Sequence, residues 1–154
     1  MRSAAFAGAL LAAASLGCGD ANPLGPRDLA DLRSELVIES APPGLERAVA
    51  ADSASWYPAA VLATGDAGIV EIEGPFRFRL RNAALQGLSL RYDLRFLDVD
   101  RFLVDRFIPF GQPLLLGEGE AKLAQGTFVI RAPIDVGRYG LATMVIAVRV
   151  EAVP

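Results

Sequence analysis

IVEIEGPFRFRLRNAALQGLSLRYDLRFLDVDRF, residues 69–102 of a 154-residue chain, alternates apolar and polar side chains with a period of two. The even positions are apolar or glycine from Val70 to Leu80, and apolar again from Leu88 to Phe96 after the turn-forming segment NAALQG. A helix would scatter these residues around its circumference, whereas a strand places them on two opposite faces. The pattern predicts two half-buried antiparallel strands, with Phe78 and Tyr92 in the core.

The rest of the chain offers strands that can cover this apolar face. Each large apolar side chain gains about 1.5 to 3 kcal/mol by leaving water, so a second sheet is required. Short segments rich in β-branched or aromatic residues lie at 35–40, 101–110, 112–116, 121–134 and 141–153. The long connection after residue 40 includes GLERAVAAD, 44–52, which is compatible with a short helix. We expect one all-β domain over residues 35–154, an immunoglobulin-like antiparallel β-sandwich of roughly seven strands.

The N-terminus has the layout of an export signal. Arg2 precedes thirteen uncharged residues, AAFAGALLAAASL, and this run is too short and too rich in alanine to span a bilayer. The only cysteine, Cys18, follows in SLGC, which resembles the bacterial lipobox, where the cysteine is lipidated. Cleavage by an ordinary signal peptidase would instead leave an exported free thiol. We expect a signal peptide at 1–17, a lipid-anchored tether at 18–34 and no transmembrane helix in the mature protein.

Composition excludes several classes of function. The chain has no histidine, which removes Ser-His-Asp and Cys-His catalysis, and with Cys18 used as an anchor the usual zinc sites are absent too. Without Arg2, 14 basic residues face 18 acidic ones, a net charge of −4 that argues against general nucleic-acid binding. We therefore expect a non-enzymatic protein with no cofactor, no metal and no nucleic-acid partner.

The order of strands and turns over residues 35–152 resembles the YcfL-like small bacterial lipoproteins. The features that carry the resemblance are an Asn that ends one strand, an aromatic strand that finishes in Phe-x-Asp-x-Asp, and a later Gly-Glu turn: Asn82, Phe96, Asp98, Asp100, Gly117 and Glu118. Arg101 stands where that family has a turn glycine, and Phe110 where tryptophan is common. The resemblance implies an immunoglobulin-like sandwich on a lipid anchor in a Gram-negative envelope. It implies no established activity.

Arginines at alternate positions form the most suggestive candidate site. If the two central strands turn their apolar sets to one core as neighbours, five arginines share the outer face with Asp93, a local charge of +4: Arg77, Arg79, Arg81, Arg91 and Arg95. Such a face could bind an anionic ligand, phospholipid head groups or an acidic partner. The alternative is a solvated face on which Asp93 pairs with Arg77, while Glu71 and Glu73 neutralise Arg95.

Three other motifs favour structural roles. Asp98, Asp100 and Asp105 are too few and too widely spaced for a calcium loop, so we expect turn-forming side chains that bond the nearby backbone. The GEGE segment, with Glu118 and Glu120, indicates a glycine turn and not a pair of catalytic carboxylates. Trp56 and Tyr57 are expected to pack over the edge of the sandwich.

These observations favour an envelope lipoprotein that binds or scaffolds another envelope component. The membrane would be reached through lipid on Cys18, and the domain would face the periplasm, with the outer membrane preferred over the inner. Two alternatives stay open. One is a subunit that adds an edge strand to a larger assembly, which an uncovered last strand, MVIAVRV, would favour. The other is a hydrolase that uses carboxylates alone.

Overall fold

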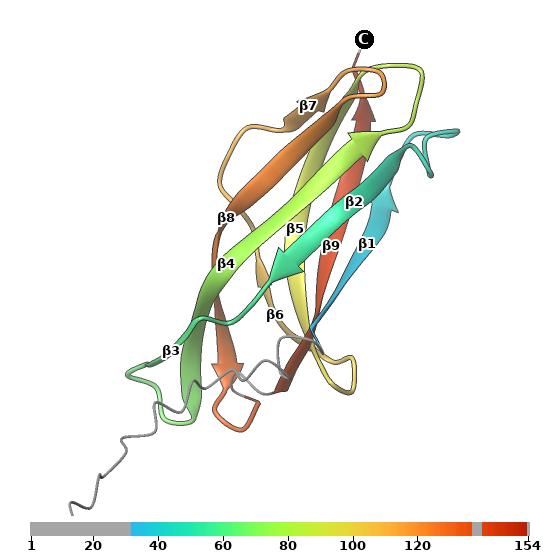
Figure 1. The fold of residues 1–154 in the computed structure, drawn as a ribbon. Helices are drawn as coiled ribbons and strands as arrows, with labels where there is room; N and C mark the ends of the chain where they lie inside the picture. The colour runs from blue at the N-terminus through green and yellow to red at the C-terminus, as the bar shows by residue number, and fades with distance from the viewer. Residues whose placement is uncertain (1–31, 137–139, 154) are drawn as a thin grey trace, which may run out of the picture.

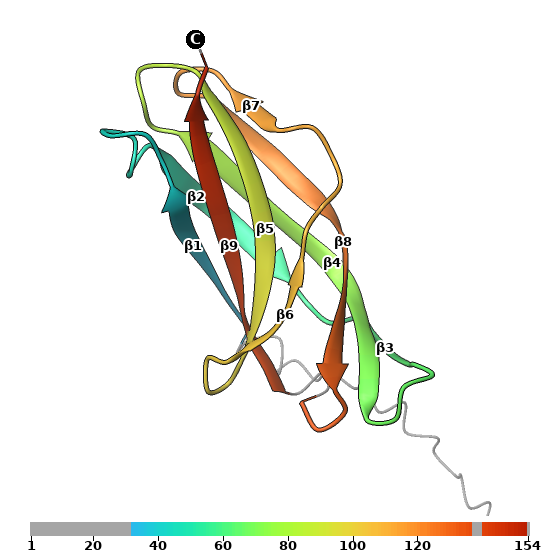
Figure 2. The same cartoon turned by 180° about the vertical axis from the view of Figure 1, so that it is seen from behind.

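The computed structural model describes residues 32–136 and 140–153, and its strands form two sheets packed face to face (Figures 1 and 2). This arrangement confirms the predicted all-β sandwich. The strands are β1 (Arg33–Ser40), β2 (Val49–Trp56), β3 (Ala60–Ala63), β4 (Ile69–Asn82), β5 (Leu88–Asp98), β6 (Leu103–Phe107), β7 (Leu114–Leu116), β8 (Ala121–Pro133) and β9 (Leu141–Ala152).

Nine strand segments occupy seven positions in the two sheets. One sheet has the order β1-β9-β5, and β6 and β7 follow each other along the far edge of β5. In the other sheet β2 and β3 share one edge of β4, and β8 pairs with its other edge. Roughly seven strands were expected, and two of the seven are interrupted. The expectation of purely antiparallel pairing is wrong at one place, because β1 runs parallel to β9.

The core follows the period-two pattern. All even positions of β4 are buried, and Phe78 and Leu80 are completely so. The rings of Trp56, Phe96 and Phe128 pack together, with centroids 4.4 to 6.1 Å apart. Tyr92 is less buried than predicted, although its ring packs edge-to-face on Phe78 at 5.0 Å. These rings supply much of the apolar area that holds the sheets together.

Gly74, on β4, makes room for the segment that connects β2 to β3 along the same edge of β4. A Cβ atom at this position would lie 1.9 Å from the carbonyl oxygen of Tyr57, so no other residue fits without a backbone shift. This connecting segment is held against β4 by a hydrogen bond of 2.8 Å from the Ala59 amide to the Glu73 carbonyl oxygen. The glycine in the apolar series of β4 therefore marks a close backbone approach.

Asn82 holds the connection between β4 and β5, which carries the chain from one sheet to the other. Its side chain is buried, and its Nδ2 donates to the carbonyl oxygens of Gln86 at 2.7 Å and Gly117 at 2.9 Å. Its Oδ1 accepts a bond of 2.8 Å from the Ala84 amide. Because this connection is an arch and not a hairpin, β4 and β5 lie in different sheets.

The helix considered for residues 44–52 is absent. The chain turns at Leu45 and Ala48, where the Ala48 amide donates to the Leu45 carbonyl at 3.0 Å, and β2 begins at Val49. The edge of β4 supplies ladder partners from Val49 onward, and both Leu45 and Val49 enter the core. Sheet pairing and burial outweigh the helical propensity of this segment.

Hydrogen bonds between a side chain of one sheet and the main chain of the other link the sheets at both open sides of the sandwich. On one side, Trp56 Nε1 on β2 donates to the Arg33 carbonyl oxygen on β1 at 2.9 Å. On the other, Asp105 Oδ2 on β6 accepts from the Arg131 amide on β8 at 2.7 Å. Trp56 packs at the edge of the sandwich, as predicted, but Tyr57, which was expected to pack there too, is 44% exposed.

Candidate binding site

The five predicted arginines do not share one face. Arg77, Arg79 and Arg81 project from β4, whereas Arg91 and Arg95 project from β5 in the other sheet. Both strands turn their apolar sets to a common core, but from opposite sides, so their polar sets leave the sandwich in opposite directions. The predicted single face is wrong because the β4–β5 connection was treated as a link between neighbouring strands.

On the outer face of the β5 sheet, arginines surround a buried carboxylate. Asp93 is only 4% exposed, although it lies at an outward-facing position. Its Oδ2 lies 3.0 Å from Arg95 Nε and 3.9 Å from Arg106, and its Oδ1 lies 3.8 Å from Arg149. The expected pairing of Asp93 with Arg77 is therefore wrong. The alternation of β5 gave no sign of this burial.

Glu39 on β1 completes this network. Its carboxylate accepts hydrogen bonds from Arg95 and from Arg149 Nε, the latter at 3.0 Å. The bonds from Arg95 and Arg149 lower the pKa of Glu39 below its usual value of 4.5, and the bonds to Glu39 and Asp93 raise the pKa of Arg95. Glu71 and Glu73, which were expected to neutralise Arg95, lie on β4 in the other sheet. The arginines of this network already have anionic partners.

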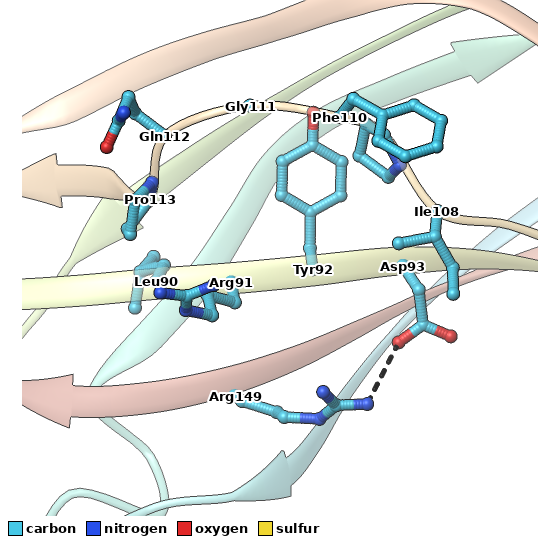
Figure 3. A pocket seen from close by; sticks show the side chains of 11 residues that line it. Leu90, Arg91, Tyr92, Asp93, Ile108, Phe110, Gly111, Gln112, Pro113 and Arg149 are labelled. Carbon is cyan, nitrogen blue, oxygen red and sulfur yellow. Dashed lines mark ion pairs between the residues drawn. The ribbon is translucent and has the colours of Figure 1, made fainter.

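Beside this network, a hollow of about 220 Å³ opens along β5 (Figure 3). It lies between β5 and the segment 108–113, which joins β6 to β7. Figure 3 shows the Tyr92 ring directed toward this segment, while Arg149 and Asp93 lie on the other side of the β5 ribbon. Arg91 also lines the hollow, and the structure records no ion pair between Arg91 and any described residue.

The outer face of the β4 sheet carries the other three arginines in the second half of β4, and Glu71 and Glu73 lie on the same face in its first half. Arg81 pairs with Asp52 at 3.1 Å, while no described residue forms an ion pair with Arg77 or Arg79. Their neighbours across the ladder are uncharged. Ser53 and Leu123 flank Arg79, and Ser55 and Gln125 flank Arg77.

A second hollow, of about 580 Å³, adjoins this row at Arg77. The outward side chains that line it carry hydroxyl and amide groups, and Tyr57 at its edge is 44% exposed. The lining residues that project outward are Ser55, Tyr57, Arg77, Gln125 and Thr127. We name the surface formed by Arg77, Arg79, Arg81 and this hollow the β4 face. It combines the guanidinium groups of Arg77 and Arg79, which form no ion pair with a described residue, with hydrogen-bonding groups and an exposed aromatic ring.

Of the acidic motifs, Asp98 and Glu120 stabilise turns, whereas Asp105 lies in β6 and accepts a bond from the Arg131 amide in the other sheet, so its predicted role in a turn is wrong. Asp98 Oδ1 accepts bonds from the amides of Asp100 at 3.0 Å and Phe102 at 2.8 Å, as predicted for a turn. Glu120 Oε2 accepts from the Gly117 amide at 2.7 Å, which closes the GEGE turn. Within residues 32–136 and 140–153, no group of three potential ligands could hold a metal ion. No helix in the same ranges has the length and hydropathy needed to cross a membrane.

Two further predictions concern the lipid anchor and the last strand. Cys18 and the signal peptide lie outside the described residues. The last strand was expected to favour strand addition if left uncovered, but β9 lies between β1 and β5 and has both edges paired.

Comparison with known proteins finds no matching family model, and no significant match among curated proteins or solved structures.

Proposed function

We propose that this protein is a non-enzymatic envelope lipoprotein that binds an acidic segment of another envelope protein through the β4 face. The observation that carries the proposal is the contrast between the two outer faces. On the β5 sheet, Asp93 and Glu39 form ion pairs with Arg95 and Arg149, whereas Arg91 forms no ion pair with a described residue. On the β4 sheet, Arg77 and Arg79 project beside uncharged neighbours.

The spacing of the arginine row supports an extended protein segment as the partner. Alternate residues of a strand repeat at about 6.7 Å, so the three guanidinium groups start from positions with that spacing. An extended acidic peptide that lies along β4 presents every second side chain at the same interval. Arg77 and Arg79 can then each bind one carboxylate with two hydrogen bonds, while Arg81 is already paired with Asp52.

The lipid anchor at Cys18 is the second part of the proposal, and it rests on the signal-like run that ends at Gly17. Mass spectrometry of the mature N-terminus should find an acylated Cys18, and Cys18→Ser should release the protein from membranes. An unmodified N-terminus that begins elsewhere would refute the anchor. That result would refute the lipid anchor alone and would not bear on binding by the β4 face.

The β4 face can be tested with fluorescein-labelled hexaglutamate as a probe. Fluorescence anisotropy should show saturable binding that weakens with added salt, because exposed charges are screened. Arg77→Glu together with Arg79→Glu should weaken binding at least about tenfold, since repulsion replaces two pairs. Arg47→Glu, at an exposed position outside both the β4 face and the hollow beside β5, is the matched control and should leave the affinity unchanged. Equal affinities for all three proteins would remove the β4 face as the binding surface.

A further inference from the structure

The edge of β5 is interrupted where the hollow of Figure 3 lies. Along β5, the pairing with β7 ends at Leu90, opposite Leu114. The pairing with β6 begins at Leu94, opposite Phe107. Six residues, 108–113, therefore stand opposite only three, 91–93. The extra length makes this segment bulge away from β5, and the prolines at 109 and 113 have no amide proton with which to restore the ladder.

This gap is short and closed at both ends. The pairings with β6 and β7 on either side leave no room for a strand that runs along the whole edge of β5. The chain end of a peptide can still enter from outside and meet the main chain of Arg91–Asp93. Main-chain pairing at an exposed sheet edge is a common mode of peptide recognition.

The charge around the gap favours an anion. Two arginines, Arg91 and Arg149, line the hollow, against one carboxylate, that of Asp93. Two positive charges and one negative charge leave an excess of +1 in the lining. Arg91 is the member of this set with no anionic partner among the described residues, and it lines the hollow.

The remaining lining is apolar. Ile108 and Phe110 are exposed, and the Phe110 side chain is fully accessible at the tip of the segment. Leu90 and Tyr92 line the hollow from the side of β5. A volume of about 220 Å³ suits one apolar side chain together with its terminal carboxylate.

We propose that this hollow binds the C-terminal end of a peptide, with the terminal carboxylate on Arg91 and the last side chain against Phe110 and Tyr92. Arg91–Asp93 offers the peptide amide a main-chain partner. This site is on the opposite sheet from the β4 face and does not depend on the function proposed there.

The probe is N-acetylphenylalanine, which contains one amide, one apolar side chain and a free carboxylate. Titration into the isotopically labelled protein, followed by backbone amide NMR, should give saturable shifts at Arg91–Asp93, Gly111 and Gln112. We expect a dissociation constant on the order of 1 mM for so small a ligand. Two further probes separate the contributions: N-acetylphenylalanine amide lacks the carboxylate, and 3-phenylpropionate lacks the amide.

Arg91→Gln should weaken binding of N-acetylphenylalanine about tenfold, the loss expected for one charge-assisted hydrogen bond. Arg47→Gln, at an exposed position outside both proposed sites, should change nothing, and the same spectra report whether each variant is folded. Both partial probes should bind more weakly than the parent. Equal binding of the amide probe would overturn carboxylate recognition, and equal binding of 3-phenylpropionate would overturn main-chain recognition. The absence of saturable shifts at Arg91–Asp93 would overturn the site itself.

Discussion

Trp56 and Arg33 join the two sheets through one hydrogen bond, from the indole Nε1 to the Arg33 carbonyl oxygen at 2.9 Å. The indole ring is buried in the core, so the bond fixes the start of β1 to β2 of the opposite sheet. β1 is the edge strand of its sheet, and its ladder partner is β9. The bond therefore supports the strand through which the chain enters the domain.

Trp56→Phe should loosen β1 more than the rest of the domain. The substitution retains an aromatic ring but removes the donor, which leaves the Arg33 carbonyl without its partner and costs about 1 to 2 kcal/mol. Hydrogen exchange should become faster at the amides of β1, while those of β4 change less. Tyr57→Phe, at the exposed neighbouring position, is the control. Uniform acceleration in both strands would show that Trp56 stabilises only the core.

Arg101 has a left-handed backbone conformation, with φ of 67°, in the turn that follows Asp100. Glycine adopts this conformation without the steric cost that a Cβ atom brings. Arg101→Gly should therefore be more stable than Arg101→Ala by about 1 kcal/mol, since both variants lose the pair with Glu35 and only alanine keeps the strain. Urea denaturation of the two variants measures this difference. An alanine variant at least as stable as the glycine variant would contradict it.

Glu39 should make stability depend on acidity. Hydrogen bonds from Arg95 and Arg149 lower its pKa in the folded protein, so its stabilising contribution is complete above the usual carboxyl value of 4.5 and is lost as the pH falls through the lowered folded pKa. Glu39→Gln should therefore be less stable than wild type at neutral pH, and the gap should close in acid. Urea titrations from about pH 7 to about pH 3 test this. A gap that stays constant with pH would show that the charge of Glu39 is irrelevant.

The sequence predicted which side chains face the core because that depends only on local alternation. Phe78 and Leu94 are completely buried, as their parity indicates. It did not predict which sheet each strand joins, since sheet membership depends on long-range contacts such as those of Asn82 with Gln86 and Gly117. The five arginines predicted to share one face therefore lie on two different sheets.

The hollow beside β5 and the burial of Asp93 were also missed. Pro109 and Pro113, four residues apart between two apolar segments, were an available sign of an interrupted edge strand. Asp93 lies between Arg91 and Arg95 on one strand face, but the arginines that bury it also come from β6 and β9. A pattern within one strand cannot reveal partners supplied by other strands.

The binding role of the β4 face is tested most directly by crosslinking in cells. A photoreactive residue at Ser53, directly across the ladder from Arg79, places the probe within the proposed contact. We predict a crosslink to one envelope protein through an acidic segment, which mass spectrometry of the adduct identifies. Arg77→Glu with Arg79→Glu should abolish the adduct, and Arg47→Glu, outside both proposed sites, should preserve it. A crosslink that survives the double substitution, or one that maps to a segment without acidic residues, would contradict the account.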